Sequence, residues 1–332
     1  MEGADGVETT HRPPAGPHKT PRPGGSLARN AETFPVYGMV EVMARTTEHL
    51  AMLFPGQGSQ TADMRDQVER QRPDLLELAR SEVSDDLFER AADGTAWAQP
   101  AIFCAALAGY ELLKPRYEAD LMAGHSLGEI TALVAADALD AADGLRLVAA
   151  RGRLMQQAAE QTGDGGMMAV RVRERAPVEE VAAETGLSIA NDNAPDQLVL
   201  SGAIAALDRA EELLRERKVR AKRLPVAGAF HSPLMEPAVA PFRELVEQVE
   251  VRAPRVPVLS CVTAAPFDDV QEQLVQALTS PVRWTGVLGT LHELGATHFV
   301  ETGPGRALTN LVRKSLDGVE AEAPLAMEAA NA

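Results

Sequence analysis

Cysteines, aromatic residues and positive charge are all scarce in this 332-residue chain, and each scarcity excludes a class of protein. The two cysteines, Cys104 and Cys261, stand far apart in apolar surroundings and can form neither a disulfide framework nor a metal-ligand cluster. Aromatic residues make up only 4%, which argues against a platform on which bases stack. Lys and Arg number 32 against 48 Asp and Glu, so the net charge of −16 disfavours a general nucleic-acid binder.

The chain also lacks an apolar run that could span a membrane. Its longest uncharged stretch, residues 94–110, contains Gln99 and Pro100, is short for a span, and is typical of a loop that enters a buried helix. The N-terminus has no compact apolar core of the kind that a secretion signal needs. We therefore expect no membrane association and a cytoplasmic protein with reduced thiols.

Apolar residues make up 45% of the chain, which is ample for a packed core. Residues 1–48 are rich in proline and show no sustained apolar period, so we expect a disordered tail there. From residue 50 onward, strands are expected at 50–54, 119–124, 256–262 and 297–303, with helices at 98–113, 127–139, 145–159, 270–278 and 306–316. This alternation predicts an α/β fold with a mostly parallel sheet.

The stretch 166–227 has a different rhythm. Its expected elements run strand, helix, strand, strand, helix, strand, at 166–172, 177–185, 187–192, 197–202, 205–218 and 219–226. That order is the split βαβ, or ferredoxin-like, pattern. Because α/β signals resume after residue 227, we interpret the stretch as an inserted subdomain.

The strongest local signal is GHSLG at 124–128, a G-x-S-x-G that follows an apolar strand and precedes a helix. This context is typical of a nucleophile elbow, in which the glycines allow a sharp turn and expose the hydroxyl of Ser126 at the helix start. The amide of Leu127 would then point at an oxyanion formed there. The alternative is an incidental glycine-rich turn with a capping serine.

A nucleophilic serine needs a base, and His231, in GAFHSPLM at 228–235, is the best placed of the seven histidines. It follows the end of the inserted stretch, and ligand sites tend to lie where two parts of a chain meet. A histidine with a purely structural role is the alternative. His125 flanks Ser126, but we expect its side chain to point away from the serine.

Two further segments offer polar groups to the same site. Arg151, in RGRLM at 151–155, carries a planar guanidinium that matches a carboxylate, although a solvated helix cation or a structural ion pair fits the sequence equally well. FPGQGSQ at 54–60 is a glycine turn without the Gly-Lys-Ser/Thr of a phosphate loop. Such a turn can instead supply an oxyanion-hole amide, here that of Gln57.

In their order along the chain, these segments resemble the malonyl-CoA:acyl-carrier-protein transacylase family, which includes the acyltransferase domains of polyketide synthases. The matching segments are FPGQGSQ (54–60), GHSLGE (124–129), RGRLM (151–155), AFHSPLM (229–235), SPVRW (280–284) and ETGPGRALTNL (301–311). The resemblance implies an α/β-hydrolase-like catalytic body at 49–164 and 228–320, with the ferredoxin-like insertion at 165–227. These parts would lie between the N-terminal tail and a flexible C-terminal tail at 321–332.

The resemblance also implies a role for each matched residue. Ser126 corresponds to the acylated nucleophile, and His231 corresponds to its base. Arg151 corresponds to the arginine that holds the free carboxylate of malonyl. Gln57 and Leu127 correspond to the oxyanion-hole pair, which acts through backbone amides. No metal or other cofactor is implied, and the substrate would be malonyl-CoA.

Two positions bear on selectivity and on the third catalytic member. Methylmalonyl-type members usually carry serine where this chain has Phe230, whose bulk would fill the space that a branched α-carbon needs. Many members carry Gln four residues before the proline of SPVRW, where this chain has Ala277. The family residue is held to orient the histidine through its backbone carbonyl, which alanine also supplies.

The reaction implied is a two-step transfer of malonyl from CoA to Ser126 and then to the phosphopantetheine thiol of an acyl carrier protein, in fatty-acid or polyketide synthesis. One alternative is a serine hydrolase that acts on acyl thioesters. Typical α/β-hydrolases place their histidine late in the chain, whereas His231 is followed by a long stretch, and Arg151 has no use in a plain esterase. The other alternative is a non-catalytic module that binds the carrier protein.

Carrier proteins are generally acidic, so docking on this acidic chain needs a local basic patch. Basic residues cluster at the end of an expected helix and in the strand that leads back toward the base, namely Arg215, Arg217, Lys218, Arg220, Lys222 and Arg223. We expect Arg217, Lys218 and Lys222 to contribute to docking, with a solvated helix end as the alternative. We expect the chain to act as a monomer.

Overall fold

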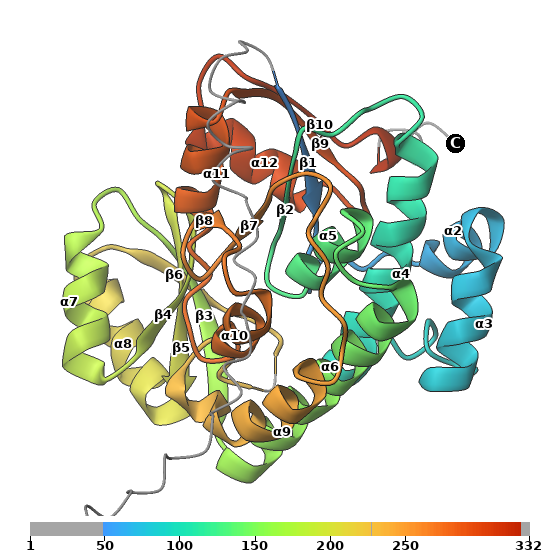
Figure 1. Cartoon of the computed structure of the whole chain (residues 1–332). Helices are drawn as coiled ribbons and strands as arrows, with labels where there is room; N and C mark the ends of the chain where they lie inside the picture. The colour runs from blue at the N-terminus through green and yellow to red at the C-terminus, as the bar shows by residue number, and fades with distance from the viewer. Residues whose placement is uncertain (1–48, 227, 327–332) are drawn as a thin grey trace, which may run out of the picture. The chain divides into compact units, whose positions relative to one another are not determined.

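Two β-sheets organise residues 49–226 and 228–326, which are the residues that the computed structural model describes (Figure 1). These residues belong to one unit, Phe34–Ala332. The predicted N-terminal tail at 1–48 lies outside the described residues, as do residue 227 and residues 327–332.

The larger sheet has six strands in the order β10-β9-β1-β2-β7-β8. They are β1 (His49–Phe54), β2 (Leu121–Gly124), β7 (Val258–Ser260), β8 (Ala265–Pro266), β9 (Ala296–Glu301) and β10 (Glu320–Glu322). Every pairing is parallel except that of β7 with β8. Because parallel neighbours need crossover connections, the strands alternate with helices along the chain, as the sequence predicts.

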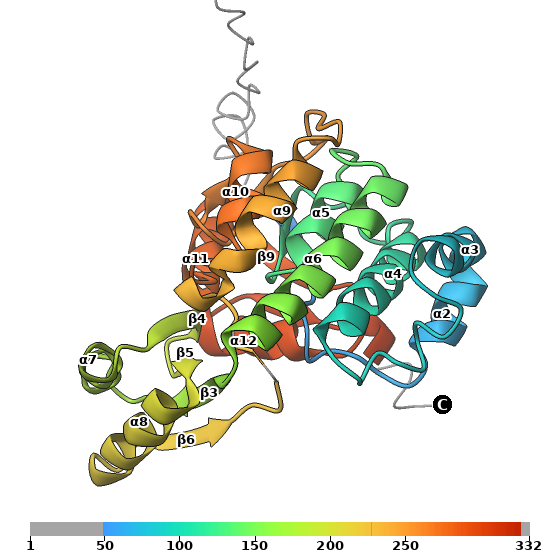
Figure 2. The ribbon, with the colours of Figure 1, turned by 90° about the horizontal axis from the view of Figure 1, so that it is seen from below.

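Helices cover both faces of this sheet, which explains why its central strands are apolar without a break. In β1, Met52 and Phe54 point into one core, and Ala51 and Leu53 into another. The first core lies under α4 (Thr95–Leu113), α5 (Gly128–Ala135), α6 (Ala141–Thr162) and α9 (Glu236–Val246) (Figure 2). The second lies under α11 (Trp284–Glu293) and α12 (Ala307–Ser315).

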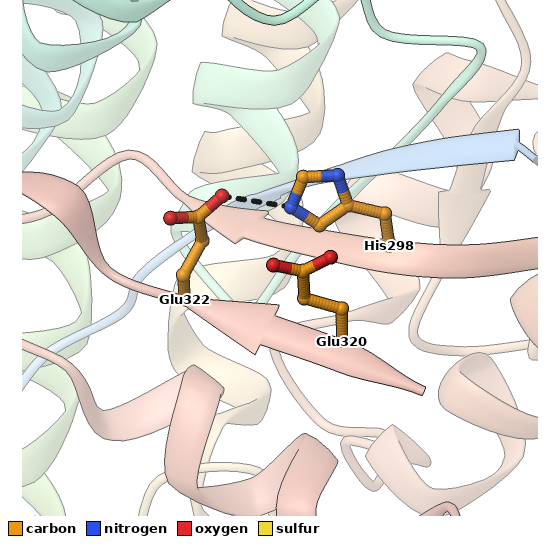
Figure 3. A group of neighbouring side chains, drawn as sticks. All are labelled: His298, Glu320 and Glu322. Atoms are coloured by element: carbon orange, nitrogen blue, oxygen red, sulfur yellow. Dashed lines mark hydrogen bonds and ion pairs between the residues drawn. The ribbon is translucent and has the colours of Figure 1, made fainter. Parts of the chain in front are cut away.

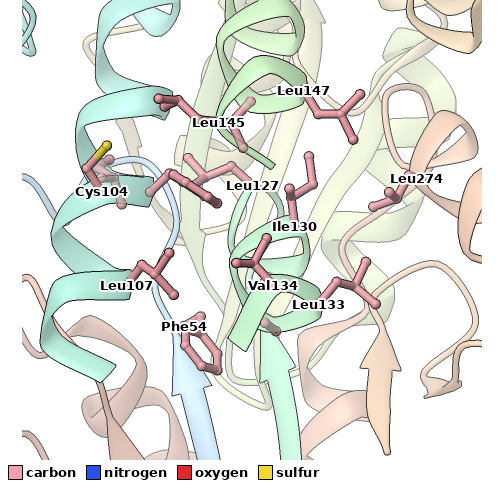
Figure 4. Packing of buried hydrophobic residues seen from close by; sticks show 14 of the residues in the cluster. Phe54, Cys104, Leu107, Leu127, Ile130, Leu133, Val134, Leu145, Leu147 and Leu274 are labelled. Carbon is pink, nitrogen blue, oxygen red and sulfur yellow. The ribbon is translucent and has the colours of Figure 1, made fainter. Parts of the chain in front are cut away.

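The first core contains the helix that follows the G-x-S-x-G segment. Figure 4 shows Phe54 of β1, Leu107 of α4 and Val134 of α5 in this core, and all three are buried. Fully burying a side chain of this size stabilises the fold by about 1.5–3 kcal/mol. The start of α5, and with it the position of the serine, is therefore held by apolar packing.

The smaller sheet is antiparallel in every pairing and has the order β4-β5-β3-β6. Its strands are β3 (Gly165–Arg171), β4 (Ser188–Ala194), β5 (Gln197–Ala203) and β6 (Arg220–Arg223), with α7 (Ala176–Thr185) after β3 and α8 (Ile204–Glu216) after β5. Both helices pack on one face, where Met168, Val170 and Leu200 form a separate core. Met167 and Val199 face the other way, toward the larger sheet and its helices.

Several elements differ from those that the sequence predicts. The apolar patterns missed α2 (Met64–Gln71), α3 (Pro73–Glu82), α9 and α11. α4 begins at Thr95, three residues before the helix expected at 98–113, and its first turn packs closely against Gly152 of α6. Residues 321 and 322, expected in a flexible tail, pair with β9 as part of β10. Within the described residues, no helix has the length and apolarity needed to cross a bilayer.

Candidate active site

The carboxyl ends of β1, β2 and β7 lie at one edge of the larger sheet, and the segments that follow them build the site. β1 leads into the turn at 55–60, β2 into the serine turn and β7 into Cys261. This edge is where open α/β sheets bind their ligands. The amide of His125 donates to the carbonyl of Phe54 at 2.9 Å, which ties the serine turn to the end of β1.

The turn that carries Ser126 is as tight as the G-x-S-x-G pattern predicts. Ser126 has a φ of 54°, in the left-handed region that costs a non-glycine residue about 1–3 kcal/mol. A Cβ on Gly124 would lie 1.9 Å from the carbonyl carbon of Gly128, and a Cβ on Gly128 would lie 2.3 Å from the carbonyl oxygen of Phe54. Both glycines are therefore required by close backbone approach, and the serine stands at the start of α5.

His231 lies beside Ser126 although 105 positions separate them in the sequence. The hydroxyl oxygen of Ser126 is 2.9 Å from Nε2 of His231. Nδ1 of the same ring lies 2.9 Å from the carbonyl oxygen of Ala277 and 3.2 Å from that of Ser280. Because a carbonyl oxygen only accepts hydrogen bonds, Nδ1 carries the proton and Nε2 offers its lone pair to the serine. Ala277 thus makes the contact expected of its backbone carbonyl.

The surroundings of His231 keep its ring neutral. Burial lowers the pKa of His231 to about 3, and the positive charge of Arg151 acts in the same direction, as does His125. The imidazole therefore holds no second proton at neutral pH. It is able to take a proton from the serine hydroxyl, which is what a general base does.

Arg151 is buried on α6 and directed at the serine. Its side chain is 3% exposed. Nη2 donates to the hydroxyl oxygen of Ser126 at 3.1 Å, and Nη1 donates to Oε1 of Gln99 at 2.9 Å. Burial lowers the pKa of Arg151 to about 10, so the group stays positive at neutral pH. Arg151 makes no ion pair with any described residue, so it is neither a solvated helix cation nor half of a structural ion pair.

Gln99 belongs to a hydrogen-bonded chain that the sequence analysis did not find. Its Nε2 donates to the hydroxyl oxygen of Thr95 at 2.8 Å, and that hydroxyl donates to Oε1 of Gln57 at 2.8 Å. These hydrogen bonds connect the turn after β1 with the guanidinium of Arg151. The sequence offers one signal, a polar residue within the apolar run of the helix expected at 98–113, and that residue was given no role.

The six residues that the resemblance assigns to the reaction and to acyl selectivity line one cavity of about 290 Å³. They are Gln57, Ser126, Leu127, Arg151, Phe230 and His231. The smaller sheet completes the wall with Met167, Asn191, Asn193 and Val199. The amides of Gln57 and Leu127 donate no hydrogen bond to another described residue, so both are available to a ligand.

His125 lines the same cavity as Ser126, and its ring contacts the smaller sheet. Its Nε2 lies 2.8 Å from Oδ1 of Asn193 on β4, and its ring meets that of Trp284 edge-on with centroids 5.3 Å apart. Burial lowers the pKa of His125, so it is neutral at neutral pH. The residue next to the serine thus links the two sheets.

A buried carboxylate stands behind the serine turn, and the sequence analysis did not single it out. Glu129 is 1% exposed, and its Oε1 accepts the amide hydrogen of Cys261 at 2.7 Å. Burial raises the pKa of Glu129 to about 7, against the opposing effects of the Cys261 amide and of the charge on Arg151. The thiol of Cys261 donates to the carbonyl oxygen of Gly124 at 3.1 Å, and burial raises its pKa well above the usual value.

Potential metal ligands gather elsewhere, on neighbouring strands at the edge of the larger sheet. His298 of β9 and Glu320 and Glu322 of β10 each offer a ligand atom, all within 4.8 Å of one another (Figure 3). Nε2 of His298 lies 2.8 Å from Oε1 of Glu322. None of the three lines the cavity around Ser126.

The residues predicted to dock a carrier protein lie directly after α8, where Arg217 is the C-cap and Lys218 follows, and on β6, which contains Lys222. Arg217 donates to the carbonyl oxygen of Pro177 at 2.7 Å and forms an ion pair with Glu180 at 3.3 Å. Lys218 and Lys222 are exposed and line a groove of about 730 Å³.

Comparison with known proteins is consistent with this site. The family model of the acyl transferase domain matches residues 51–327. The polyketide biosynthesis protein ThaF of Burkholderia thailandensis is 39% identical over 282 residues, which are 80% of this chain and only 24% of that protein. The malonyl CoA-acyl carrier protein transacylase of Bacillus subtilis is 36% identical over 285 residues, which are 80% of this chain and 90% of that protein.

A solved structure extends the likeness to the fold. The crystal structure of a malonyl-CoA:acyl carrier protein transacylase from Xanthomonas oryzae pv. oryzae superposes with a TM-score of 0.78 at 38% identity. The match covers 86% of this chain and 98% of that chain. The chain therefore spans about a quarter of the length of ThaF and nearly all of this solved structure. On these grounds, the chain belongs to the acyl transferase domain family.

Proposed function

We propose that this chain is an acyl-carrier-protein S-malonyltransferase, which moves malonyl from malonyl-CoA to the phosphopantetheine thiol of an acyl carrier protein for fatty-acid or polyketide synthesis. The observation that carries the proposal is buried Arg151, which donates to Ser126 and makes no ion pair with any described residue. A buried guanidinium without a carboxylate in direct contact keeps its planar donors available for an anionic partner. The free carboxylate of a malonyl thioester is such a partner, and the printed names of the relatives support the same substrate.

The first half-reaction loads the serine. Nε2 of His231 takes the proton of Ser126 as the serine oxygen attacks the thioester carbonyl of malonyl-CoA. The amides of Gln57 and Leu127 donate hydrogen bonds to the oxyanion that forms. His231 then gives the proton to the leaving thiolate as the carbon–sulfur bond breaks, which yields malonyl-serine and CoA. A general base contributes about 10²–10⁴-fold, and one oxyanion donor about 10²–10³-fold.

The second half-reaction reverses these roles. His231 takes the proton of the phosphopantetheine thiol, and the thiolate attacks the ester carbonyl of malonyl-serine. The same two amides stabilise the new oxyanion. When the ester bond breaks, His231 returns the proton to the oxygen of Ser126, and malonyl leaves on the carrier protein. No step requires a metal or another cofactor.

Selectivity for malonyl depends on two side chains in the cavity wall. The planar guanidinium of Arg151 can donate two hydrogen bonds to the free carboxylate of malonyl. An acetyl group has no such carboxylate and would leave these donors unpaired. Phe230 is 8% exposed and lines the same cavity. Its ring restricts the space around the α-carbon of the acyl group, so a methyl branch there is disfavoured.

We also propose the finer organisation of the fold. The sheet order β4-β5-β3-β6, with α7 and α8 on one face, supports a ferredoxin-like insertion at 165–227. The parallel sheet with a serine turn after β2 supports an α/β-hydrolase-like body at 49–164 and 228–320. The pairing of β10 favours a body that continues to residue 322.

The carrier protein is proposed to dock beside the groove on the smaller sheet. Lys218 and Lys222 are exposed there and form no ion pair with another described residue. Arg217 contributes less because Glu180 already pairs with it. A monomeric state and a cytoplasmic location stay predictions of the sequence.

Intact mass spectrometry tests the reaction. Incubation with malonyl-CoA should add one malonyl group to the wild-type protein and none to Ser126→Ala. The adduct should then disappear when an acyl carrier protein is added, and the carrier should gain the same mass. Release of free malonate at the same rate without a carrier would favour a hydrolase, and absence of any adduct would favour a non-catalytic module.

A further inference from the structure

We propose that Glu129 is the buried counter-charge of Arg151 and that it takes up a proton when the carboxylate of a malonyl group binds that arginine. This inference rests on the proposed function and deepens it. It gives Glu129 a role in distinguishing acyl groups with a free carboxylate from those without one. Neither half-reaction of the proposed transfer uses Glu129 directly.

Glu129 is fixed on the protein side of the serine turn. Its amide donates to the carbonyl of Ser126 at 3.1 Å. Its carboxylate is buried, and Oε1 accepts the amide hydrogen of Cys261 at 2.7 Å. Glu129 does not line the cavity in which the acyl group would lie. The carboxylate is therefore close to the reacting groups without touching the substrate.

Glu129 and Arg151 are buried groups of opposite charge that both contact Ser126, Glu129 through its backbone amide and Arg151 through Nη2, and they form no direct ion pair with each other. The hydrogen bonds of Arg151 go to Gln99 and Ser126, which are both neutral. The charge of Glu129 favours the positive form of Arg151, and Arg151 favours the ionised form of Glu129. The negative charge of Glu129 thus offsets the positive charge of Arg151 in the interior. The guanidinium can still donate hydrogen bonds to a carboxylate that binds beside Ser126.

A malonyl carboxylate that pairs with Arg151 would change this balance. It brings a second negative charge into the same buried region and offsets the positive charge of Arg151. The ionised form of Glu129 is then stabilised less, and the pKa of Glu129 rises further. Burial already raises the pKa of Glu129 to about 7, and a further rise moves its titration across neutral pH. By linkage, a protonated Glu129 strengthens malonyl binding to the same extent as malonyl binding favours the proton.

The other titratable groups around α5 keep one charge state near neutral pH. Burial raises the pKa of the Cys104 thiol on α4 to about 12 and that of the Cys261 thiol well above its usual value. Burial lowers the pKa values of His125 and His231, so both rings stay neutral. Among the described residues of this cluster, Glu129 is therefore the group that can exchange a proton on binding.

Isothermal titration calorimetry tests the proposal on Ser126→Ala, which cannot be acylated. Malonyl-CoA and acetyl-CoA are each titrated into the full-length protein at about pH 7.5, in phosphate and in Tris, whose different ionisation enthalpies report the protons exchanged. We expect uptake of a substantial fraction of one proton per malonyl-CoA bound. Acetyl-CoA carries the same CoA phosphates without the free carboxylate, and we expect no uptake with it.

The double variant Ser126→Ala, Glu129→Gln identifies the group that binds the proton. Glutamine keeps an acceptor for the amide of Cys261 but cannot ionise, so malonyl-CoA should bind without proton uptake. Glu301→Gln in the same Ser126→Ala background is the matched control. Glu301 is also a buried carboxylate with a pKa raised by burial, but it accepts the amides of Leu308 and Thr309 and does not line the cavity.

The outcomes separate this proposal from the function on which it rests. Malonyl-CoA binding to Ser126→Ala without proton uptake overturns the role of Glu129, whether or not the glutamine variant folds. Loss of uptake in the Glu301 control as well would also overturn it. In the wild-type enzyme, KM for malonyl-CoA should rise by up to about tenfold per pH unit above neutrality, with little change in kcat. Failure of malonyl-CoA to bind Ser126→Ala and to acylate the wild type would instead contradict the proposed function.

Discussion

The two sheets differ in how many of their faces carry helices. The larger sheet is packed between helices on both faces, so the ends of β1 and β2 are held by two cores. The smaller sheet carries α7 and α8 on one face, and its other face supplies walls of the cavity. The groups proposed to react all come from the segments around the larger sheet. Reacting groups need positions held within fractions of an ångström, which favours the doubly covered sheet for them.

Polar links join the two sheets near the cavity. His125 meets Asn193 at 2.8 Å, and Thr285 donates to Oδ1 of Asp192 at 2.8 Å. A single β-bridge adds a third link, from Asn191 to Val282. These polar links and the apolar packing of Met167 and Val199, and not a shared sheet, hold this side of the cavity. Variants in the smaller sheet should therefore change fit and docking more than chemistry. Substitutions in each sheet can test this difference between chemistry at the larger sheet and fit or docking at the smaller one.

Ser126→Ala should have the largest effect, because it removes the proposed nucleophile from the edge of the larger sheet. Transfer should fall by roughly 10⁴–10⁶-fold, since the base and the oxyanion donors cannot act without an attacking oxygen. Thermal unfolding should change little, because the substitution removes one oxygen at a cavity wall. A malonyl adduct on this variant would place the nucleophile elsewhere.

Arg151→Ala should lose malonyl transfer by about 10²-fold or more, because hydrogen bonds to a charged group are worth about 1.5–3 kcal/mol each. Acetyl transfer should fall much less, since acetyl has no carboxylate to pair. Arg151→Lys is the matched control, because it keeps the charge but loses the planar fork. The measurement is the rate of malonyl transfer and of acetyl transfer to one carrier protein, in the wild type and in each variant. Equal losses of both rates would show that Arg151 has a structural role.

His231 should make stability depend on pH. Its pKa is lowered from 6.5 to about 3 in the folded protein, so below pH 6.5 the unfolded chain binds a proton that the folded chain does not. This contribution is present above pH 6.5 and is lost as pH falls, at on the order of 1 kcal/mol per pH unit. Glu129 acts with the opposite sign between its usual pKa of 4.5 and about 7.

Urea unfolding of the wild type and of His231→Gln between about pH 5 and 7 isolates the histidine, because Glu129 is common to both proteins. The wild type should gain free energy of unfolding relative to the variant as pH rises to 6.5. A difference that does not change with pH would show that the folded His231 titrates normally.

Phe230→Ser should relax selection against methylmalonyl-CoA. The change opens volume beside the acyl group, and one methyl group in a pocket is worth about 1–3 kcal/mol. Phe230→Leu should give an intermediate result because it opens less space. The malonyl-to-methylmalonyl ratio of kcat/KM is the measurement, and an unchanged ratio would remove Phe230 from the specificity argument.

Reversal of Arg217, Lys218 and Lys222 to Glu should have the smallest effect, a severalfold rise in KM for the carrier protein. Malonylation of Ser126 by malonyl-CoA should not change, and added salt should weaken the wild-type carrier reaction. Lys218→Glu with Lys222→Glu should retain most of the effect, because Arg217 is already paired with Glu180.

Charge reversal at Arg65 and Arg80 is the matched control for docking, because both lie on α2 and α3, outside the smaller sheet. Those two changes should leave the carrier kinetics unaltered. Normal carrier kinetics in the triple variant would place the docking surface elsewhere.

Local patterns were enough to predict the alternation of strands and helices, the order of elements in 166–227 and the turn at Ser126. Each of these depends on residues that are close in sequence: an apolar period, a Gly-rich turn, or the backbone crowding that requires Gly124 and Gly128. The same reasoning failed for β10, because so short a strand is defined by its pairing with β9. The start of α4 was predicted three residues too late for a similar reason, since its first turn at residues 95–97 packs against Gly152 of α6.

The charge states and hydrogen bonds of the site were decided by the tertiary structure. The sequence left open whether Arg151 offers its guanidinium to a carboxylate, is solvated or forms a structural ion pair. In the structure it is buried beside Gln99 and Ser126 and forms no ion pair with any described residue. Glu129 gained its raised pKa from the same burial. Hydrogen bonds such as that between Arg151 and Gln99 join residues 52 positions apart, and desolvation depends on every neighbour in space. Neither effect leaves a periodic trace in the chain, so only the folded structure contains it.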